Sequence, residues 1–195
     1  MNKLREIYEE GRKQYGESPE SFSDKGSVHT YIDTYYDILK DKKYCKIFEI
    51  GVRTGGSIWL WRKLLEDYEI WGIDLDSSYF GNRPFAEELR NDANIHVRFK
   101  RNSFDKSSYE DIPKDFDLII DDGDHSAEGI SRTFEHAWHH LKSGGVYVIE
   151  DPQSDEAINT VKNKIIEVAP SAEITVLKFR PNSDDNLIIV NKKED

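Results

Sequence analysis

Short apolar runs alternate with amphipathic stretches along most of the chain. The apolar runs have the length and composition of buried strands, and they cover residues 46–50, 69–73, 94–99, 116–120 and 146–149. Between them, apolar residues recur every three or four positions, a pattern typical of helices, at residues 57–67, 85–90 and 127–141. The sequence Ser143-Gly144-Gly145 is expected to end the last of these helices. Strands that alternate with helices predict a parallel sheet with helices on both faces.

The C-terminal stretch has a different pattern. A helical segment at residues 155–168 precedes two apolar segments, 173–179 and 186–190, which a short polar turn joins. Parallel neighbours need a long crossover connection, so these two strands must form an antiparallel hairpin. We therefore predict an α/β fold with a doubly wound, Rossmann-like sheet that is mostly parallel and is closed by a C-terminal antiparallel hairpin.

The length of 195 residues suits one domain. We expect residues 1–195 to form a single domain, in which residues 1–42 are an N-terminal helical segment. In this segment a polar helix comes first, the loop at 16–26 is rich in Ser, Pro, Gly and acidic residues, and apolar positions from Val28 to Leu39 recur at helical spacing. The single cysteine, Cys45, lies beside an apolar strand and is expected to be a buried thiol.

Charge and composition exclude several classes of partner. The chain carries 27 Lys and Arg against 38 Asp and Glu, a formal net charge of -11, whereas phosphate binding needs clustered basic residues. We therefore expect no nucleic-acid partner and a neutral or cationic small molecule as ligand. No apolar run is long enough to cross a bilayer and no signal peptide is recognisable, so we expect a cytoplasmic protein without a membrane partner. Exposed aromatic side chains are compatible with a homo-oligomer.

A glycine-rich turn follows the first predicted strand. Its sequence, Glu49-Ile-Gly51-Val-Arg53-Thr-Gly55-Gly56, resembles the E/D-x-G-x-G-x-G signature of S-adenosylmethionine-binding proteins, with Arg53 in place of the middle glycine. Glu49, Gly51 and Gly55 are therefore candidate cofactor-binding residues, because glycines let the backbone approach the cofactor and a carboxylate can orient its ammonium group. The turn is not G-x-G-x-x-G and contains no P-loop lysine, which argues against a nicotinamide or nucleoside-triphosphate ligand.

The ends of the following strands carry further candidate cofactor ligands. Asp74 closes the second strand about 25 residues after Glu49, where a carboxylate can accept hydrogen bonds from both ribose hydroxyls. Asn102 and Ser103 follow the third strand, where such proteins place side chains against adenine, although the polarity of a turn would also explain the pair. Asp121, at the end of the fourth strand, belongs to the same candidate set.

Carboxylates and one histidine gather at the ends of two neighbouring strands. Asp122, Asp124 and His125 follow the buried strand in FDLIIDDGDH, and Glu150 and Asp151 end the next strand. Removing these charges from water without compensation is costly, so a cation or a ligand is the natural partner. Oxygen donors without sulfur suit Mg²⁺. Capping of the following helix is the alternative for some of them, above all for Asp124.

These motifs together resemble a known family. The segments are SDKGSVH with TYIDTYYDIL, then EIGVRTGGSIWLW, WGIDLD, FDLIIDDGDH and GGVYVIED. They are similar to the metal-dependent sugar O-methyltransferases of antibiotic biosynthesis, the group of the macrolide (mycinamicin) 2''-O-methyltransferases and rhamnosyl O-methyltransferases. The resemblance covers residues 23–151 and implies a class I S-adenosylmethionine-dependent methyltransferase, a class whose sheet ends in a hairpin of the kind predicted here.

The resemblance also implies a reaction and a role for each candidate. The reaction is methyl transfer from S-adenosylmethionine to a hydroxyl of a small molecule, a sugar or glycoside. Asp122, Glu150 and Asp151 correspond to the Mg²⁺ ligands of the family and His125 to its general base, while Asp124 stands where the family commonly has serine. The chemistry is consistent, because coordination to a metal ion lowers the pKa of a hydroxyl and an imidazole can remove its proton near neutral pH.

Two other functions fit part of the pattern. A metal-dependent hydroxylase or hydrolase on the same fold could use the D-x-x-H turn, Asp122 to His125, together with Glu150, but the non-haem iron triad needs two histidines. A non-catalytic S-adenosylmethionine-binding protein would need Glu49, Gly51 and Asp74, but neither the histidine nor the acidic cluster.

The segment SDKGSVHTY leaves the roles of Asp24, Lys25 and Tyr31 open. It resembles a segment that flanks the cofactor in the family, but an aromatic helix face by itself indicates only packing.

Overall fold

The computed structural model describes residues 1–16, 18, 21–181 and 183–194. Within them a seven-stranded sheet has the order β3-β2-β1-β4-β5-β7-β6. The strands are β1 (Tyr44–Ile50), β2 (Asp67–Asp74), β3 (Ile95–Phe99), β4 (Phe116–Asp121), β5 (Leu141–Glu150), β6 (Glu173–Lys178) and β7 (Asn186–Asn191). β1 to β5 are parallel, whereas β7 is antiparallel to both β5 and β6. The predicted doubly wound sheet with its C-terminal antiparallel hairpin is confirmed.

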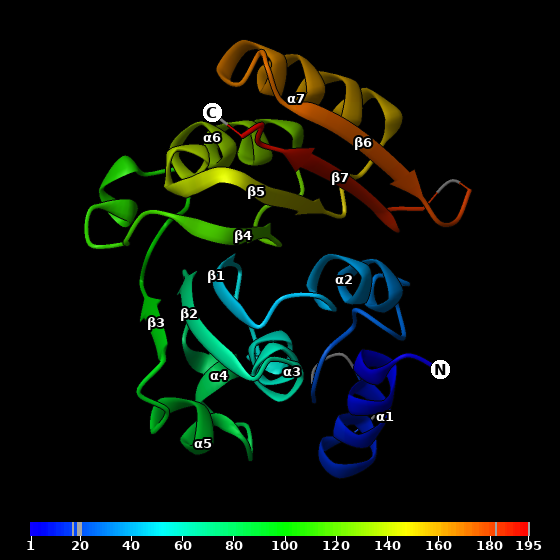
Figure 1. The fold of residues 1–195 in the computed structure, drawn as a ribbon, viewed down its shortest axis with the longest axis vertical. Helices are drawn as coiled ribbons and strands as arrows, with labels where there is room; N and C mark the ends of the chain where they lie inside the picture. The colour runs from blue at the N-terminus through cyan, green and yellow to red at the C-terminus, as the bar shows by residue number, and fades with distance from the viewer. Residues whose placement is uncertain (17, 19–20, 182, 195) are drawn as a thin grey trace.

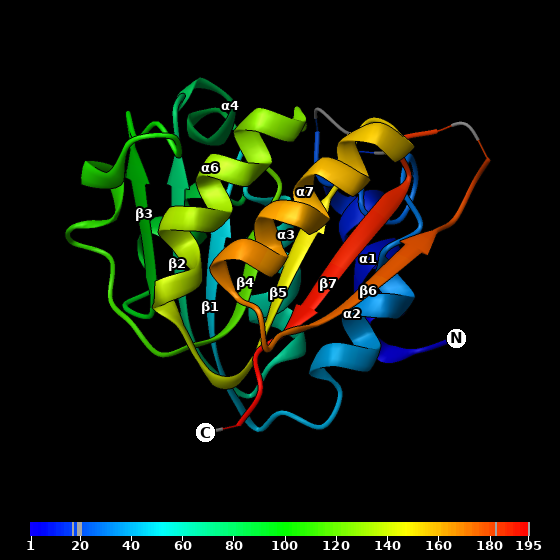
Figure 2. The same ribbon diagram turned by 90° about the horizontal axis from the view of Figure 1, so that it is seen from above.

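Helices cover both faces of the sheet (Figures 1 and 2). One face carries α6 (Ala127–Ala137) and α7 (Asp155–Val168), which contact each other. The other face carries α1 (Lys3–Tyr15), α2 (Ile32–Leu39), α3 (Gly56–Leu64) and the short helices α4 (Ser78–Gly81) and α5 (Ala86–Arg90). Short 3₁₀ turns occupy Lys106–Tyr109 and Trp138–His140.

Apolar side chains fill the layers between the sheet and its helices. Ile47 and Leu118 pack into the cluster on the side of α1 to α3, whereas their chain neighbours Phe48 and Ile119 pack into the cluster on the side of α6 and α7. This alternation follows from the two-residue period of a strand. Cys45 shares the face of Ile47 and is fully buried, and burial raises the pKa of its thiol to about 12. The prediction of a buried thiol is confirmed.

The helix expected over 57–67 ends at Leu64, because β2 begins at Asp67, and two further differences from the sequence prediction are larger. The helix expected over 127–141 ends at Ala137, and after a 3₁₀ turn the chain enters β5 at Leu141. The Ser143-Gly144-Gly145 sequence therefore lies inside β5, where the register with β4 shifts, and does not end a helix. The prediction was wrong because Leu141 pairs with Phe116 of β4, and this long-range pairing outweighs the local glycine signal.

The second difference lies in the N-terminal segment. The helical pattern predicted from Val28 becomes a helix only at Ile32. The preceding residues form turns instead, in which the backbone amides of Ser27 and His29 both donate to the carbonyl of Asp24 at 3.0 Å. These turns bring residues 24–29 over the carboxyl ends of the strands, which a continuous helix would not do.

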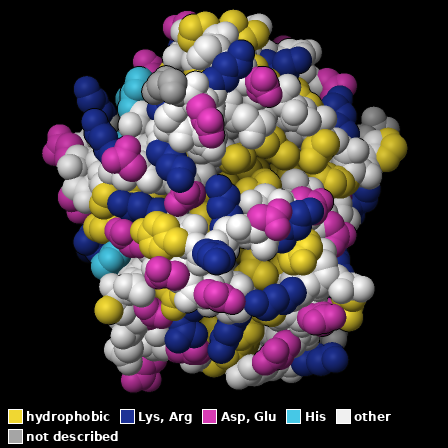
Figure 3. Space-filling view, viewed as in Figure 1, with side chains coloured by type: hydrophobic (Ala, Val, Ile, Leu, Met, Phe, Trp, Pro, Cys, Tyr) yellow, Lys and Arg dark blue, Asp and Glu magenta, His cyan; other side chains and the backbone are white. Residues whose placement is uncertain are grey.

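Charges of both signs cover the surface. On the face seen in Figure 3, basic and acidic side chains are interspersed, so no single-sign field dominates it. Within the described part of the chain, no helix combines the length and apolar composition that crossing a membrane requires.

Candidate active site

A cavity of about 740 Å³ opens at the carboxyl ends of β1 to β5. It lies where the strand order reverses between β1 and β4, the usual ligand position in doubly wound sheets. The predicted site residues that line it are Glu49, Gly51, Asp74, Asn102, Ser103, Asp122, His125 and Asp151. The predicted residues that do not line it are Gly55, Asp121 and Glu150. Residues 22–25 of the N-terminal segment complete its wall.

The turn after β1 depends on glycine at two positions. Gly51 has φ +88°, and a Cβ atom there would lie 2.0 Å from the backbone oxygen of Asp122. Gly55 has φ +81°, and its Cβ would lie 2.6 Å from the ring of Phe80. Both conformations are disfavoured for other residues. The glycines therefore let β1 and β4 end side by side and let α3 begin at the cavity.

Arg53, which replaces the middle glycine of the signature, adopts a backbone conformation that glycine favours. It adopts φ +48°, in the left-handed region. Its backbone amide donates to Asp74 Oδ2 at 2.7 Å, and its guanidinium lies 3.3 Å from Asp24. Asp74 Oδ1 also accepts from the amide of Asp76 at 2.8 Å. Two backbone amides therefore orient the Asp74 carboxylate at the end of β2.

Glu49 lies at the floor of the cavity. It is fully buried, and its carboxylate accepts hydrogen bonds from the hydroxyl of Ser57 and from Trp61 Nε1, the latter at 3.0 Å. Burial raises the pKa of Glu49, whereas Lys25 and these two donors act in the opposite direction. α3 thus holds the carboxylate in one orientation.

The two residues expected beside adenine also stabilise their own turn. Asn102 Oδ1 accepts from the amide of Phe104 at 3.1 Å, and Ser103 Oγ accepts from the hydroxyl of Thr133 at 3.1 Å. Both residues line the cavity, so the turn contacts leave their predicted role open.

Asp121 points away from the cavity. Strand alternation places it on the face of Ile119, under α6, where the Tyr147 hydroxyl lies 3.4 Å from its carboxylate. Burial raises the pKa of Asp121 well above its usual range. The parity of the strand, which is visible in the sequence, could have distinguished Asp121 from Asp122.

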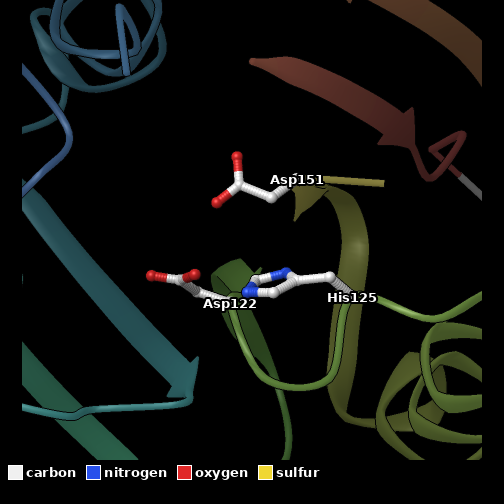
Figure 4. A group of neighbouring side chains, drawn as sticks. All are labelled: Asp122, His125 and Asp151. Carbon is white, nitrogen blue, oxygen red and sulfur yellow. The ribbon is translucent and has the colours of Figure 1, made fainter. Parts of the chain in front are cut away.

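Asp122, His125 and Asp151 converge on one point at the edge of the sheet (Figure 4). One candidate ligand atom from each lies within 4.8 Å of the other two. Asp122 directly follows β4, and its amide donates to the carbonyl of Ile50 at 2.9 Å. His125 Nδ1 lies 3.4 Å from the backbone oxygen of Glu150, so a hydrogen on Nδ1 donates there and leaves the lone pair on Nε2.

Asp151 is held by the N-terminal segment. The Tyr31 hydroxyl donates to its carboxylate, and His29 Nδ1 lies 3.2 Å from the same oxygen. Burial, followed by the charge of Asp122, raises the pKa of Asp151 to about 8. Its backbone adopts φ +56°, a strained conformation for a residue other than glycine and one that is common at functional sites.

Glu150 also contacts the N-terminal segment, but unlike Asp151 it does not line the cavity. Its two oxygens are 2.7 and 2.8 Å from Lys25 Nζ, and the hydroxyl of Tyr35 donates to it as well. Lys25 Nζ also lies 2.7 Å from Asp122 Oδ2. Burial lowers the pKa of Lys25, but these carboxylates outweigh it and hold the pKa well above its usual range. Sequence reasoning left Lys25 open and interpreted Tyr35 only as an apolar helix position.

Asp124 has a local structural contact. Its carboxylate accepts from the amide of Ser126 at 2.8 Å, while the Ser126 hydroxyl accepts from the amide of Gly129 and caps α6. Asp124 therefore supports Ser126, the residue that caps α6, and does not itself accept from an amide of the helix. His125 takes no part in the cap.

Comparison with known proteins identifies the family. Residues 48–152, more than half of the chain, match a family model described as a methyltransferase domain. Demethylmacrocin O-methyltransferase from Streptomyces fradiae is 27% identical over 135 residues, which is 65% of this chain and 32% of the relative. Mycinamicin VI 2''-O-methyltransferase from Micromonospora griseorubida is 28% identical over 144 residues, again 65% of this chain and 32% of the relative. The chain spans about a third of the length of these curated relatives.

Solved structures with the same fold belong to the same class. The MycE methyltransferase from the mycinamycin biosynthetic pathway, in complex with Mg and S-adenosylhomocysteine, superposes with a TM-score of 0.69 at 21% identity, over 95% of this chain and 54% of that one. The methyltransferase PaMTH1 from Podospora anserina, bound to S-adenosylhomocysteine, gives a TM-score of 0.68 at 15% identity, over 100% of this chain and 89% of that one. By its family match the chain belongs to the methyltransferase domain family, and its fold is the one that these methyltransferase structures share.

Proposed function

We propose that the protein is an S-adenosylmethionine-dependent O-methyltransferase that acts on a hydroxyl of a small molecule, a sugar or glycoside, with Mg²⁺ and with His125 as general base. One observation carries the proposal: candidate ligand atoms of Asp122, His125 and Asp151 lie within 4.8 Å of one another, in the cavity that Asp74 also lines. The names of the relatives support the acceptor class, since they describe O-methyltransferases, among them enzymes of rhamnosyl and olivosyl compounds.

The cofactor is proposed to lie along the turn after β1. Asp74, oriented by the amides of Arg53 and Asp76, accepts hydrogen bonds from the ribose hydroxyls. Glu49, at the cavity floor, orients the ammonium group directly or through water. Gly51 and Gly55 keep the backbone low enough for this approach. Asn102 and Ser103 also line the cavity, and adenine is proposed to lie beside them.

The acidic cluster has the chemistry that a magnesium site needs. Asp122 and Asp151 offer carboxylate oxygens close together, and Mg²⁺ usually binds one or two carboxylates and keeps several water ligands. Ionised Asp151 is costly in its buried position, and a cation beside it would offset this cost. When bound, Mg²⁺ supplies a Lewis acid that lowers the pKa of a coordinated hydroxyl.

His125 supplies the base. Its Nδ1 faces the carbonyl of Glu150, so Nε2 can accept the proton of the acceptor hydroxyl. Because Mg²⁺ prefers oxygen ligands, the imidazole stays available for the proton. Within the described residues this cluster holds one histidine and two carboxylates, not the two histidines and one carboxylate of an iron hydroxylase.

Isothermal titration calorimetry tests the proposal directly. The protein should bind S-adenosylmethionine and S-adenosylhomocysteine and should not bind NAD, because the turn lacks the G-x-G-x-x-G spacing. Each titration is run with and without Mg²⁺. Binding of NAD in preference to S-adenosylhomocysteine would contradict the proposed function.

Replacing Asp74 with alanine is expected to weaken S-adenosylhomocysteine binding. Loss of charge-assisted hydrogen bonds to the ribose should cost about 1.5–3 kcal/mol of binding free energy. The fold should persist, because Asp74 ends β2 and lines the cavity. Calorimetry measures the affinity, and Asp105→Ala, which changes an exposed aspartate outside the cavity, serves as the control. If Asp74→Ala bound the ligand with wild-type affinity, the ribose assignment would be wrong.

A further inference from the structure

Glu150 differs from the other two carboxylates of the predicted metal site. It is 1% exposed, does not line the cavity and is not in the group of close candidate ligand atoms. Lys25 Nζ contacts both of its oxygens, at 2.7 and 2.8 Å, and the Tyr35 hydroxyl donates to one of them. Its hydrogen-bonding capacity is thus largely used within the protein.

The ammonium group of Lys25 lies between two carboxylates, as a bound metal ion would. Its side chain is 2% exposed, and its ammonium lies 2.7 Å from Asp122 Oδ2 as well as against Glu150. The ammonium therefore bridges the carboxylates that follow two neighbouring strands, β4 and β5. The backbone carbonyl of Lys25 accepts from the amide of Tyr31 at 2.9 Å, which ties this cation to the residue that holds Asp151.

We propose that Lys25 is a positioning residue that acts as a resident cation of the acidic cluster. It neutralises Glu150 and orients Asp122, so that the metal ion is bound by Asp122 and Asp151, and Glu150 is a partner of Lys25 and not a metal ligand. This inference rests on the proposed function, which supplies the divalent ion. It assigns the ion to Asp122 and Asp151, whereas the family resemblance implies Asp122, Glu150 and Asp151.

The physical reason is the count of charges. Glu150 and Asp151 are buried and Asp122 is partly exposed, and burying a carboxylate charge without a partner is costly. Lys25 places one positive charge between Asp122 and Glu150, so the apo protein can keep both of these side chains in place. Metal affinity depends on the number of charged ligands and on their rigidity. Lys25 should therefore weaken metal binding while it preorganises the site.

Four variants test this assignment with Mn²⁺ as the probe, measured by electron paramagnetic resonance. Mn²⁺ takes the oxygen ligands that suit Mg²⁺. Glu150→Gln should bind Mn²⁺ within about threefold of wild type, whereas Asp151→Asn should bind it at least about tenfold more weakly. Lys25→Met should bind it about tenfold more tightly, because Glu150 becomes available. The double variant Lys25→Met/Glu150→Gln restores the net charge and should return close to wild-type affinity.

The comparison stays decisive if Lys25→Met does not fold. In that case the ligand set is decided by the other three variants, Glu150→Gln, Asp151→Asn and the double variant. The double variant should fold because it leaves no unpaired carboxylate buried at position 150. A purely structural Lys25 would change the melting temperature of a folded Lys25→Met protein and leave its Mn²⁺ affinity unchanged, which would overturn the proposal. The proposal would also be overturned if Glu150→Gln lost as much affinity as Asp151→Asn, or if the wild type bound no Mn²⁺.

The same samples separate this inference from the proposed function. Titration with S-adenosylhomocysteine reports on the cofactor site, which none of the four variants removes. A wild type that binds Mn²⁺ in the expected order of variants but binds no S-adenosylhomocysteine would contradict the proposed function and uphold the assignment of Lys25.

Discussion

Replacing His125 with alanine is expected to lower kcat by about 10²–10⁴-fold, the range for loss of a positioned proton acceptor. The imidazole lies against the carboxylates of Asp122 and Asp151, and its Nδ1 faces the backbone oxygen of Glu150. An acceptor hydroxyl bound at this cluster would therefore be within reach of Nε2.

The control for this experiment is His139→Ala, which removes an exposed histidine outside the cavity. Single-turnover rates and melting temperatures are measured for both variants. His125→Ala should keep its melting temperature and its affinity for S-adenosylhomocysteine, because Ser126 and not His125 caps α6. A destabilised His125→Ala protein with a normal single-turnover rate would rule out the general-base role.

Replacing Asp122 with asparagine is expected to abolish Mg²⁺-dependent turnover. The amide has nearly the same shape but no charge, so it is a poor ligand for a hard cation and a weaker partner for Lys25 at 2.7 Å. Cofactor affinity should change little, because the ribose site at Asp74 belongs to a different strand end. Activity is assayed against Mg²⁺ concentration, with S-adenosylhomocysteine affinity measured by calorimetry on the same protein.

Asp124→Asn is the matched control, since it makes the same change two residues later in the same turn. Its side-chain oxygen can still accept from the amide of Ser126, so turnover and stability should stay near wild type. The wild-type enzyme treated with EDTA provides the second arm. Full activity after EDTA treatment would contradict the metal-dependent mechanism, whatever the effect of Asp122→Asn.

The sequence by itself determined the sheet and the turn after β1. Strand positions could be predicted because a buried parallel strand needs a short continuous apolar run, a requirement that is local. The hairpin of β6 and β7 followed from the length of its connection. Gly51 could be identified because its backbone conformation, φ +88°, is one that few other residues adopt. Each of these requirements depends on neighbours in the chain.

Local signals were insufficient where a distant partner decides the conformation. Gly144 and Gly145 predicted the end of a helix, but the chain is already in β5 at Leu141, which pairs with Phe116 of β4. Asp121 and Asp122 are adjacent in the chain, yet one faces Tyr147 under α6 and the other faces Lys25 and the cavity. Strand alternation, which is visible in the sequence, indicates that the two side chains face opposite sides of the sheet, but which side holds the cavity is decided by the packing of the sheet.

The acidic cluster illustrates the same limit most clearly. The sequence placed Glu150 and Asp151 together as ligands, because both end one strand and both carry a carboxylate. In the structure Lys25, 125 residues before Glu150 in the chain, contacts both oxygens of that carboxylate. A buried charge pairs with an oppositely charged group that the fold brings within about 3 Å. Periodicity in the sequence does not encode a contact between residues so far apart in the chain. Tertiary structure alone therefore decided that Asp122 and Asp151 line the cavity, whereas Glu150 lies outside it against Lys25.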